Sequence, residues 1–253
     1  YRRHTNFAME SVEQIFNGTV AYGNSVSATI SRNGDLVHRL YLEVSENTSF
    51  STGQDVCANF GSALIDYVEC EIGGQKIDKH YGHWMEVWSE LTEFNPTGAA
   101  GGLSSGDVSG GTLFQRMSYM GGVEGESNDS TTNVCNKAFV PLQFWFCRNP
   151  GLALPLIALQ YHEVKIKLQF QTKSLIFGSG DFGTSTLSCQ LWADYIYLDT
   201  DERRRFAQVS HEYLIEQVQF SNSSANTTHK LNFNHPVKEL VWTGGVVTSA
   251  ISY

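Results

Sequence analysis

The residues best suited to metal chemistry are two histidines and a glutamate in one predicted helix. His80 and His83 are three residues apart and Glu86 follows one turn later, so their side chains could form a facial metal set. Zinc hydrolase helices instead place their two histidines four residues apart, with a glutamate beside the first. We therefore expect no metal site, and we expect His80 and His83 to be surface residues that flank Tyr81 and Trp84.

A pair of carboxylates offers a second kind of chemistry. Glu69 and Glu71 lie on one face of a predicted strand, and two carboxylates that flank a sugar bond are the machinery of a glycoside hydrolase. Gly73-Gly74 after residue 72 is a turn signal, and the position of the two carboxylates beside it favours a simpler interpretation, an exposed strand edge. The sequence has no G-x-S-x-G elbow and no cysteine in a nucleophile signature. We predict a protein that is not an enzyme, with a glycoside hydrolase as the less favoured alternative.

A glycine-rich segment carries two motif matches. Residues 178–183 read GSGDFG, which fits the dinucleotide pattern G-x-G-x-x-G and contains the kinase triplet DFG. A dinucleotide site needs a helix after the glycines, whereas residues 184–198 are typical of a strand, and the kinase triplet lacks its catalytic-loop partner. The segment is therefore predicted to be a hairpin loop. We predict no catalytic, cofactor-binding or metal-ligating residue in the chain.

Charge and hydropathy exclude two classes of partner. The net charge is −9, charged residues make up only 17% of the chain, and no basic block is longer than residues 203–205. Phosphate binding needs clustered lysines and arginines, so direct nucleic-acid binding is not expected. The longest apolar run, residues 151–159, is far shorter than the about 20 residues that span a membrane. The low charge content indicates a surface partly covered by other subunits.

The cysteines and the start of the chain bear on the cellular compartment. The cysteines are widely spaced and include no C-x-x-C pair, which favours reduced, mostly buried thiols and a reducing compartment. The chain begins at Tyr1 without a signal-peptide core, so we expect that the true N-terminus is missing and interpret the Asn-x-Ser/Thr motifs as polar turns. The cysteines are Cys57, Cys70, Cys135, Cys147 and Cys189, and the motifs begin at Asn17, Asn47, Asn128, Asn222 and Asn226.

Alternating polarity predicts strands along most of the chain. In residues 164–171 the even positions are apolar and the odd ones are lysine or glutamine, which indicates one buried and one solvated face. Residues 26–31 repeat this pattern, and residues 36–44 follow it less cleanly. Asn33-Gly34 between them is typical of a tight type I′ turn. We therefore predict that these two strands pair as an antiparallel hairpin.

Further strands and one helix complete the set of predicted elements. Residues 138–147 are apolar on both faces, which suits a strand between two layers, with Pro141 near a sheet edge. A helix capped by Asp78, with aromatic and aliphatic residues at helical spacing, should stop at Asn95-Pro96 and cover a sheet end. Other strands are predicted at residues 11–16, 64–72, 113–117 and 187–198, and exposed loops at 97–111 and 121–136.

Many short antiparallel strands with long loops predict an all-β protein, a jelly-roll β-sandwich. The dense charges of residues 199–205 mark a domain boundary, after which a new strand-like pattern begins at Tyr213. The remaining residues are too few for a second sandwich, which takes about 100 residues. The tail therefore either donates strands to the first sandwich or opens a second, truncated domain.

Five sequence blocks in order resemble one known family. Together they are similar to the major capsid protein of nucleocytoplasmic large DNA viruses, in its algal-virus and giant-virus branch. The resemblance spans nearly the whole chain. The blocks are RHTNFAM (3–9), RNGDL (32–36), IGGQKIDKHYGHW (72–84), FWFCRNPGLALPLIAL (144–159) and LDTDERRRF (198–206).

The resemblance implies a structural role. It implies a double jelly roll, three copies of which form a pseudo-hexagonal capsomer in an icosahedral shell that encloses an internal membrane. Residues 1–199 would be the first jelly-roll domain, 200–211 a linker, and 212–253 the beginning of an incomplete second one. The implied partners are a homotrimer, neighbouring capsomers and minor capsid proteins, in a virion shell whose subunits are synthesised in the host cytoplasm. A carbohydrate-binding jelly-roll surface protein remains the alternative, prompted by the 12% aromatic content.

Overall fold

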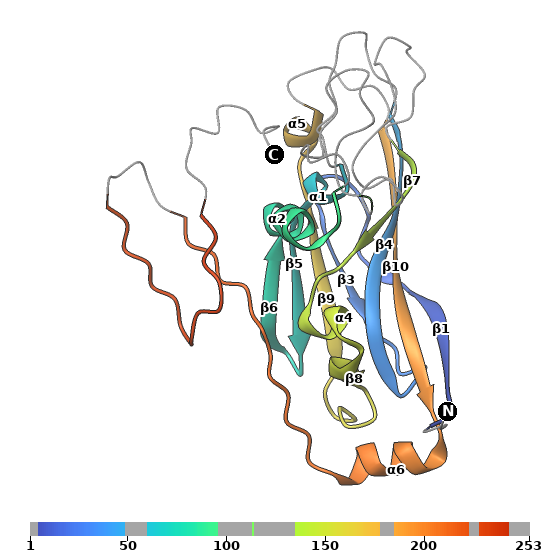
Figure 1. The fold of residues 1–253 in the computed structure, drawn as a ribbon. Coiled ribbons are helices and arrows are strands. Elements are labelled where there is room, and N and C mark those ends of the chain that lie inside the picture. The colour runs from blue at the N-terminus through green and yellow to red at the C-terminus, as the bar shows by residue number, and fades with distance from the viewer. Residues whose placement is uncertain are drawn as a thin grey trace.

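The protein is a sandwich of two antiparallel β-sheets (Figure 1), which confirms the predicted all-β jelly-roll class. The structure is a computed structural model, and it describes residues 5–48, 60–95, 113, 135–177, 185–222 and 228–242. Sheet A contains, in order, β1 (Phe7–Gln14), β10 (Ser185–Leu198), β4 (Leu36–Thr48) and β7 (Cys135–Pro141), with β8 (Leu154–Pro155) paired to β4. Sheet B contains, in order, β2 (Phe16–Asn17), β3 (Ser25–Thr29), β9 (Val164–Phe170), β5 (Ile65–Ile72) and β6 (Gln75–Tyr81).

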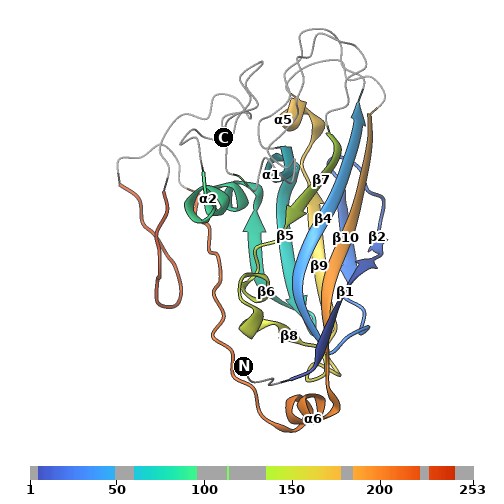
Figure 2. The same ribbon diagram turned by 45° about the vertical axis from the view of Figure 1, so that its right-hand side comes forward.

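Short helices lie around the two sheets. The helices α1 (Phe60–Ala63) and α2 (Gly82–Thr92) cover one end of β5 and β6, whereas α6 (Thr200–Gln208) lies at the opposite end of the sandwich (Figures 1 and 2). The remaining helical turns are α4 (Trp145–Arg148), η1 (Pro150–Leu152) and α5 (Lys173–Phe177). Within the described ranges, the chain has no helix that is long and apolar enough to cross a membrane.

The core lies between the sheets and follows the predicted alternation. In β9 the residues Val164, Ile166, Leu168 and Phe170 are buried and the residues between them are partly exposed. This confirms the facing of the strand, because successive side chains of a strand point to opposite sides of its sheet. A polar link crosses the core edge, where the buried Tyr195 hydroxyl donates to the carbonyl oxygen of Ser31 at 2.6 Å.

The predicted hairpin at Asn33-Gly34 is wrong, because the two flanking strands lie in different sheets. β3 pairs with β2 and β9, whereas β4 pairs with β10, β7 and β8. Gly34 has no left-handed backbone angle. A Cβ atom at this position would lie 2.8 Å from Cβ of Tyr195, so the glycine permits a close approach to β10. The connection therefore crosses from one sheet to the other.

The Gly73-Gly74 turn does form a hairpin, between β5 and β6. Both glycines have positive φ angles, 60° and 81°. A type I′ turn requires positive φ at both central residues, which glycine adopts without a steric penalty. The turn signal predicted after residue 72 is thus confirmed.

The strand predicted at residues 138–147 is shorter and more exposed than expected. β7 ends at Pro141, and α4 begins at Trp145. Among the strands that the structure describes, β7 lies at the edge of sheet A and pairs with β4 alone. Its outward residues Lys137 and Phe139 are exposed, because the second sheet covers only the inner face. The predicted position of Pro141 near a sheet edge is confirmed.

The predicted helix is present as α2, but its start is different. Its N-terminal flanking residue is Tyr81, which makes no side-chain capping bond. Asp78 instead lies inside β6, because the ladder with β5 continues as far as the pair Tyr67 and Tyr81. The prediction of Asp78 as the helix cap is therefore wrong.

Several predictions fall outside the described residues. They concern the loop 97–111, most of the loop 121–136, the strand 113–117 beyond Leu113, and the glycine-rich segment 178–183. The last two residues of the second loop are instead the start of β7.

After β10 the chain leaves the sandwich. The charged residues 200–208 form α6, whose N-cap Asp199 accepts a hydrogen bond from the backbone N–H of Thr200 at 2.8 Å. The described residues from 210 onward contain no helix or strand, so the new strand pattern predicted from Tyr213 does not form there. A strand needs backbone hydrogen bonds to a neighbouring strand, and the hydrogen bonds between the described part of this segment and β6 involve side chains instead.

Candidate functional site

The three residues considered for metal binding lie in different environments. His80 is fully buried in β6, where its Nε2 atom lies 2.8 Å from Oδ2 of Asp78 and its ring stacks on Phe144. His83 is exposed on α2, whereas Glu86 is buried. The described ranges hold no group of three or more His, Cys, Asp or Glu residues that could bind a metal. The prediction that His80 is a surface residue is wrong, because the β-ladder extends past it.

The carboxylate pair lies inside sheet B, not at its edge. Glu69 and Glu71 belong to β5, which is flanked by β9 and β6. Glu69 pairs with Lys79 of β6 at 3.3 Å, and Glu71 pairs with Lys167 of β9. Each carboxylate therefore has a cation on a neighbouring strand, an arrangement typical of a solvated sheet face. This geometry gives no support to a glycosidase pair, and the predicted exposed edge is wrong.

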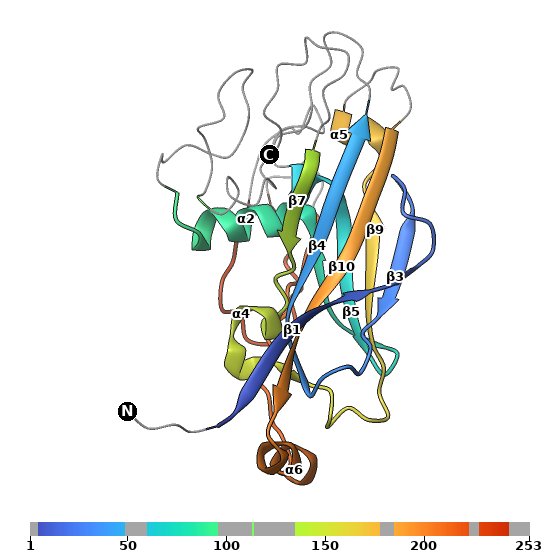
Figure 3. The same ribbon diagram turned by 90° about the vertical axis from the view of Figure 1, so that its right-hand side faces the viewer.

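The outer face of sheet A is different, because it carries an apolar stripe. Met9 lies opposite Ile196, Trp192 lies opposite Tyr41, and the rings of Tyr41 and Phe139 are 6.3 Å apart. Met9 is 52% exposed and Phe139 is 39% exposed. We call these five residues the sheet A stripe (Figure 3 shows the strands that carry it). Asp194 lies between Ile196 and Trp192 on this face of β10, so the stripe consists of two apolar patches, and exposed apolar patches mark protein interaction sites.

The polar side chains around the sheet A stripe are paired with one another. Ser11 donates a hydrogen bond to Asp194, Gln190 donates to Glu13 at 3.1 Å, and Lys137 forms an ion pair with Glu43. Groups that already have partners cost less free energy to remove from water than unpaired ones. The stripe and its rim are therefore suited to burial against another protein.

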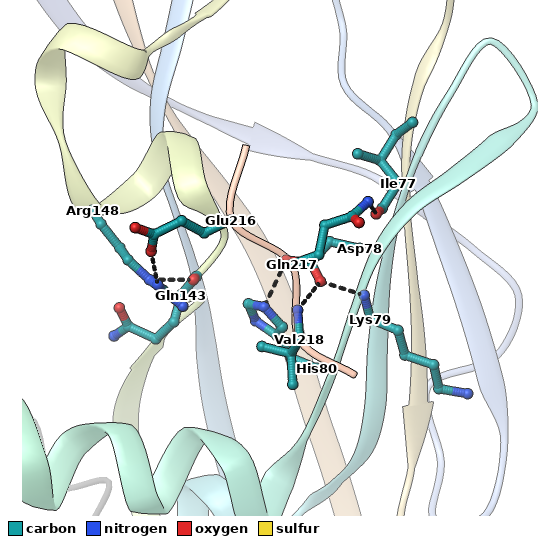
Figure 4. A network of polar contacts seen from close by, with 9 residues as sticks. All are labelled: Ile77, Asp78, Lys79, His80, Gln143, Arg148, Glu216, Gln217 and Val218. Carbon is teal, nitrogen blue, oxygen red and sulfur yellow. Dashed lines mark hydrogen bonds and ion pairs between the residues drawn. The ribbon is translucent and has the colours of Figure 1, made fainter. Parts of the chain in front are cut away.

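A second surface is formed where the chain returns to the sandwich after α6. Residues 216–220, which we call the strap, run beside β6 (Figure 2). Figure 4 shows the contacts at close range. Gln217 donates from its side chain to the carbonyl oxygen of Ile77, and the backbone N–H of Val218 donates to Oδ1 of Asp78 at 3.0 Å. The rings of Phe220 and Tyr81 are 5.1 Å apart.

Arg148 holds the beginning of the strap. Its Nη1 atom lies 3.1 Å from Oε2 of Glu216, and its Nε atom donates to the carbonyl oxygen of Gln143 at 2.8 Å. Its guanidinium carbon also lies 3.9 Å from the ring centroid of Trp88. Burial lowers the pKa of Arg148, and Glu216 opposes this shift. The Trp84 and Trp88 rings are 5.7 Å apart, so they pack against each other on α2.

The strap contacts could not be found by reading the sequence. Asp78 and Val218 are 140 residues apart, and Arg148 and Glu216 are 68 residues apart. No local motif relates residues at such separations. The only signal in the sequence was that Asp78 lies within a polar segment, and that signal suggested a helix cap.

Three of the described cysteines, Cys70, Cys147 and Cys189, are free thiols that are largely shielded from solvent. Cys70 and Cys189 are buried and Cys147 is partly buried. Burial raises the pKa of Cys147 and of Cys189 to about 12, and it also raises the pKa of Cys70. The reduced thiols predicted for these three positions are therefore present.

We expect these three thiols to resist alkylation in the native protein. The thiolate is the reacting form, and its fraction rises with pH only as the pH approaches the raised pKa. Iodoacetamide at mildly alkaline pH should therefore leave the Cys70, Cys147 and Cys189 peptides unmodified in the folded chain, and mass spectrometry measures this. The same peptides should react fully in guanidinium chloride. Rapid labelling of the native chain would contradict the described burial.

Comparison with known proteins places the chain in a family. The family model "Major capsid protein N-terminus" matches residues 1–199, and the model "Large eukaryotic DNA virus major capsid protein" matches residues 202–249. The major capsid protein of Pyramimonas orientalis virus is 55% identical over 244 residues, which cover 96% of this chain and 57% of the relative. That of Paramecium bursaria Chlorella virus 1 is 41% identical over 257 residues, which cover 96% of this chain and 54% of the relative.

The fold is also similar to that of a solved capsid. The quasi-atomic model of the PBCV-1 virus capsid contains a chain with a TM-score of 0.73 and 39% identity, and the match covers 93% of this chain and 55% of that one. The chain thus spans about half the length of the relatives that it matches. Because the first family model extends over most of the sequence, the chain belongs to the major capsid protein family of large eukaryotic DNA viruses.

Proposed function

We propose that the chain is a structural subunit of an icosahedral viral capsid and that three copies form a pseudo-hexagonal capsomer. The observation that carries this proposal is the sheet A stripe, an exposed apolar surface on a rigid sandwich whose family is that of capsid proteins. Subunit interfaces have apolar centres that are depleted in charge, surrounded by polar rims. Closed symmetry then joins many such contacts into one assembly.

The proposed partners follow from this role. They are two further copies of the chain, neighbouring capsomers and minor capsid proteins, all within the capsid shell of the virion. Synthesis in the host cytoplasm is supported by the free cysteines. The net charge of −9 supports a shell subunit without direct contact to nucleic acid. Within the chain we propose a first jelly roll at residues 1–199, a linker at 200–211 and the beginning of a second jelly roll at 212–253.

The proposed role is not enzymatic. The relatives are named as major capsid proteins, which supports a structural function. The carboxylates that prompted a hydrolase alternative are paired with lysines on neighbouring strands. No catalytic, cofactor-binding or metal-ligating residue is therefore proposed.

We expect the chain to form trimers in a concentration-dependent manner, and Phe139→Asp to weaken this association. A charge within a desolvated apolar contact should lower the association constant about tenfold or more. Phe139 is already 39% exposed, so the thermal midpoint of the monomer should change by only a few degrees. Sedimentation velocity over a range of concentrations measures the association.

Leu175→Asp is the matched control. Leu175 is 40% exposed, but it lies in α5, away from the sheet A stripe. Its substitution should leave the association constant unchanged. A chain that stays monomeric at high concentration would contradict the proposed assembly. Equal weakening by both variants would show that the sheet A stripe is not the interface.

A further inference from the structure

We propose that Asn33-Gly34 is a site of spontaneous deamidation, and that the isoaspartate formed there releases α6 from the sandwich. The motif lies in the connection between β3 and β4, where the expected hairpin turn does not form. The inference does not rest on the proposed capsid role, because the reaction needs only the chain itself and water.

The reaction joins the side chain of an asparagine to the following peptide group. The backbone nitrogen of the next residue loses its proton and attacks Cγ of the asparagine. The new C–N bond closes a five-membered succinimide, and the side-chain nitrogen leaves as ammonia. Water then opens the ring at either carbonyl carbon and leaves aspartate or isoaspartate, and no atom changes its oxidation state. A following glycine favours the attack, because no Cβ atom lies beside its nitrogen.

The chain contains two Asn-Gly pairs, Asn17-Gly18 and Asn33-Gly34, and both asparagines are exposed. Asn17 belongs to β2, where it pairs with Ser27 of β3. Ring closure brings Cγ over the next backbone nitrogen, which requires a rotation of ψ away from the extended conformation of a strand. The ladder therefore holds Asn17 in an unreactive conformation.

Asn33 is not restrained in this way. It lies outside the strands, and neither Asn33 nor Gly34 takes part in a hydrogen bond with any residue that the structure describes. The backbone nitrogen of Gly34 is thus available as the nucleophile. The exposed side chain of Asn33 is also accessible to the water that opens the ring. Asn33 is therefore the more reactive asparagine in the folded chain.

Gly34 leads directly into Asp35, a buried residue that links β10 to α6. The backbone N–H of Asp35 donates to the carbonyl oxygen of Ile196 at 3.1 Å, and its Oδ2 atom accepts from the backbone N–H of Leu198 at 2.8 Å. Its Oδ1 atom lies 2.9 Å from Nε of Arg203 in α6. Asp35 thus ties α6 to the end of the sandwich at which the helix lies (Figure 1).

Isoaspartate at position 33 would displace Asp35. The peptide link of isoaspartate runs through Cβ and Cγ, so the main chain before Gly34 gains one methylene group. Gly34 has little room to move, because even an added Cβ atom would lie 2.8 Å from Cβ of Tyr195. The extra length is therefore passed on to Asp35 and separates it from Arg203. Because α6 has only nine residues, it is marginal without such tertiary contacts.

Ageing of the purified chain tests the site of modification. After incubation at mildly alkaline pH, peptide mass spectrometry should show conversion at Asn33 about fivefold faster than at Asn17, since each ladder hydrogen bond that must open costs about 1 kcal/mol. Enzymatic methyl transfer to the free α-carboxyl group then identifies isoaspartate. In guanidinium chloride the two pairs should react at similar rates. Equal conversion in the native chain, or faster conversion at Asn17, would overturn the assignment.

Hydrogen exchange of α6 tests the structural consequence. In the converted fraction, the amides of residues 201–208 should exchange about tenfold faster, since a hydrogen bond between charged groups is lost. The amides of β9 should keep their protection, which shows that the sandwich stays folded. Asp35→Asn, which removes the charge that holds Arg203, should accelerate exchange of α6 to a similar extent in the fresh chain.

Two variants of Asn33 complete the test. Asn33→Asp adds the same charge without the extra methylene group and should leave exchange of α6 unchanged. Asn33→Gln, whose ring closure would need six members, should stay unmodified during ageing and keep α6 protected. Isoaspartate at position 33 without faster exchange of α6, or equal acceleration by Asn33→Asp, would overturn the proposed release. Loss of α6 protection in aged Asn33→Gln would do the same.

Discussion

Replacing Phe170 by aspartate is expected to unfold the sandwich. Phe170 is 1% exposed and lies at the end of β9, a strand in the middle of sheet B. The substitution removes a buried aromatic ring and places a charge in the core without a partner, at a cost of several kcal/mol. The total stability of a domain is about 5–15 kcal/mol. Circular dichroism and thermal denaturation should therefore show a chain that is unfolded or melts at a much lower temperature.

Lys167→Glu is the matched control on the same strand. Lys167 points to the solvated face of β9 and pairs with Glu71 of β5. The substitution reverses an exposed charge and leaves the core unchanged, so the thermal midpoint should shift by only a few degrees. Equal damage by the two substitutions would show that the assigned facing of β9 is wrong.

Gly82→Ala is expected to be the second strongly destabilising change. A Cβ atom at Gly82 would lie 2.2 Å from the carbonyl oxygen of Ser62 and 2.3 Å from that of Ile65. These are backbone atoms at the junction of α1 and β5, so relief requires movement of the main chain. Overpacking of this kind costs about 3 kcal/mol or more, which lowers the melting temperature by about 10 °C.

The sign of this effect is opposite to that expected from helix propensity. Gly82 is the first residue of α2, and alanine is favoured over glycine in helices by about 1 kcal/mol. Stabilisation by Gly82→Ala would therefore show that α1 does not pack against this turn.

Gly74→Ala separates steric collision from backbone strain. Gly74 has a φ of 81°, and a Cβ atom added there would meet no neighbouring atom within 4 Å. The variant should lose only the cost of a left-handed conformation, about 1–2 kcal/mol. Differential scanning calorimetry of the two glycine variants should thus show a clearly larger loss for Gly82→Ala.

Local sequence patterns predicted the elements better than their pairing. The alternation in residues 164–171 identified β9 and the face that it buries, because side-chain direction in a strand depends only on its own backbone. The Gly73-Gly74 turn was also predictable, because its φ angles belong to the turn itself. Asn33-Gly34 shows the limit of this reasoning. The same type of signal there belongs to a crossing between two sheets, where Gly34 packs against Tyr195.

The residues of the candidate sites were mostly beyond the reach of sequence patterns. Asp78 fits a helix cap in the sequence, yet in the structure it holds His80 and the strap. Glu69 resembles an edge carboxylate until β6 and β9 are placed on either side of β5. Of the neighbours that decide these environments, β9 and the strap are far away in the chain.

The order of residues alone thus determined the all-β class, the faces of the regular strands and the membership in a capsid family. Tertiary structure alone decided which strands are neighbours, which charges are paired and where the chain after α6 lies. The physical reason is the range of the forces involved. Alternation and turn preferences act over a few residues, whereas the partner of a buried carboxylate or an edge strand is chosen by contacts that form only when distant segments meet.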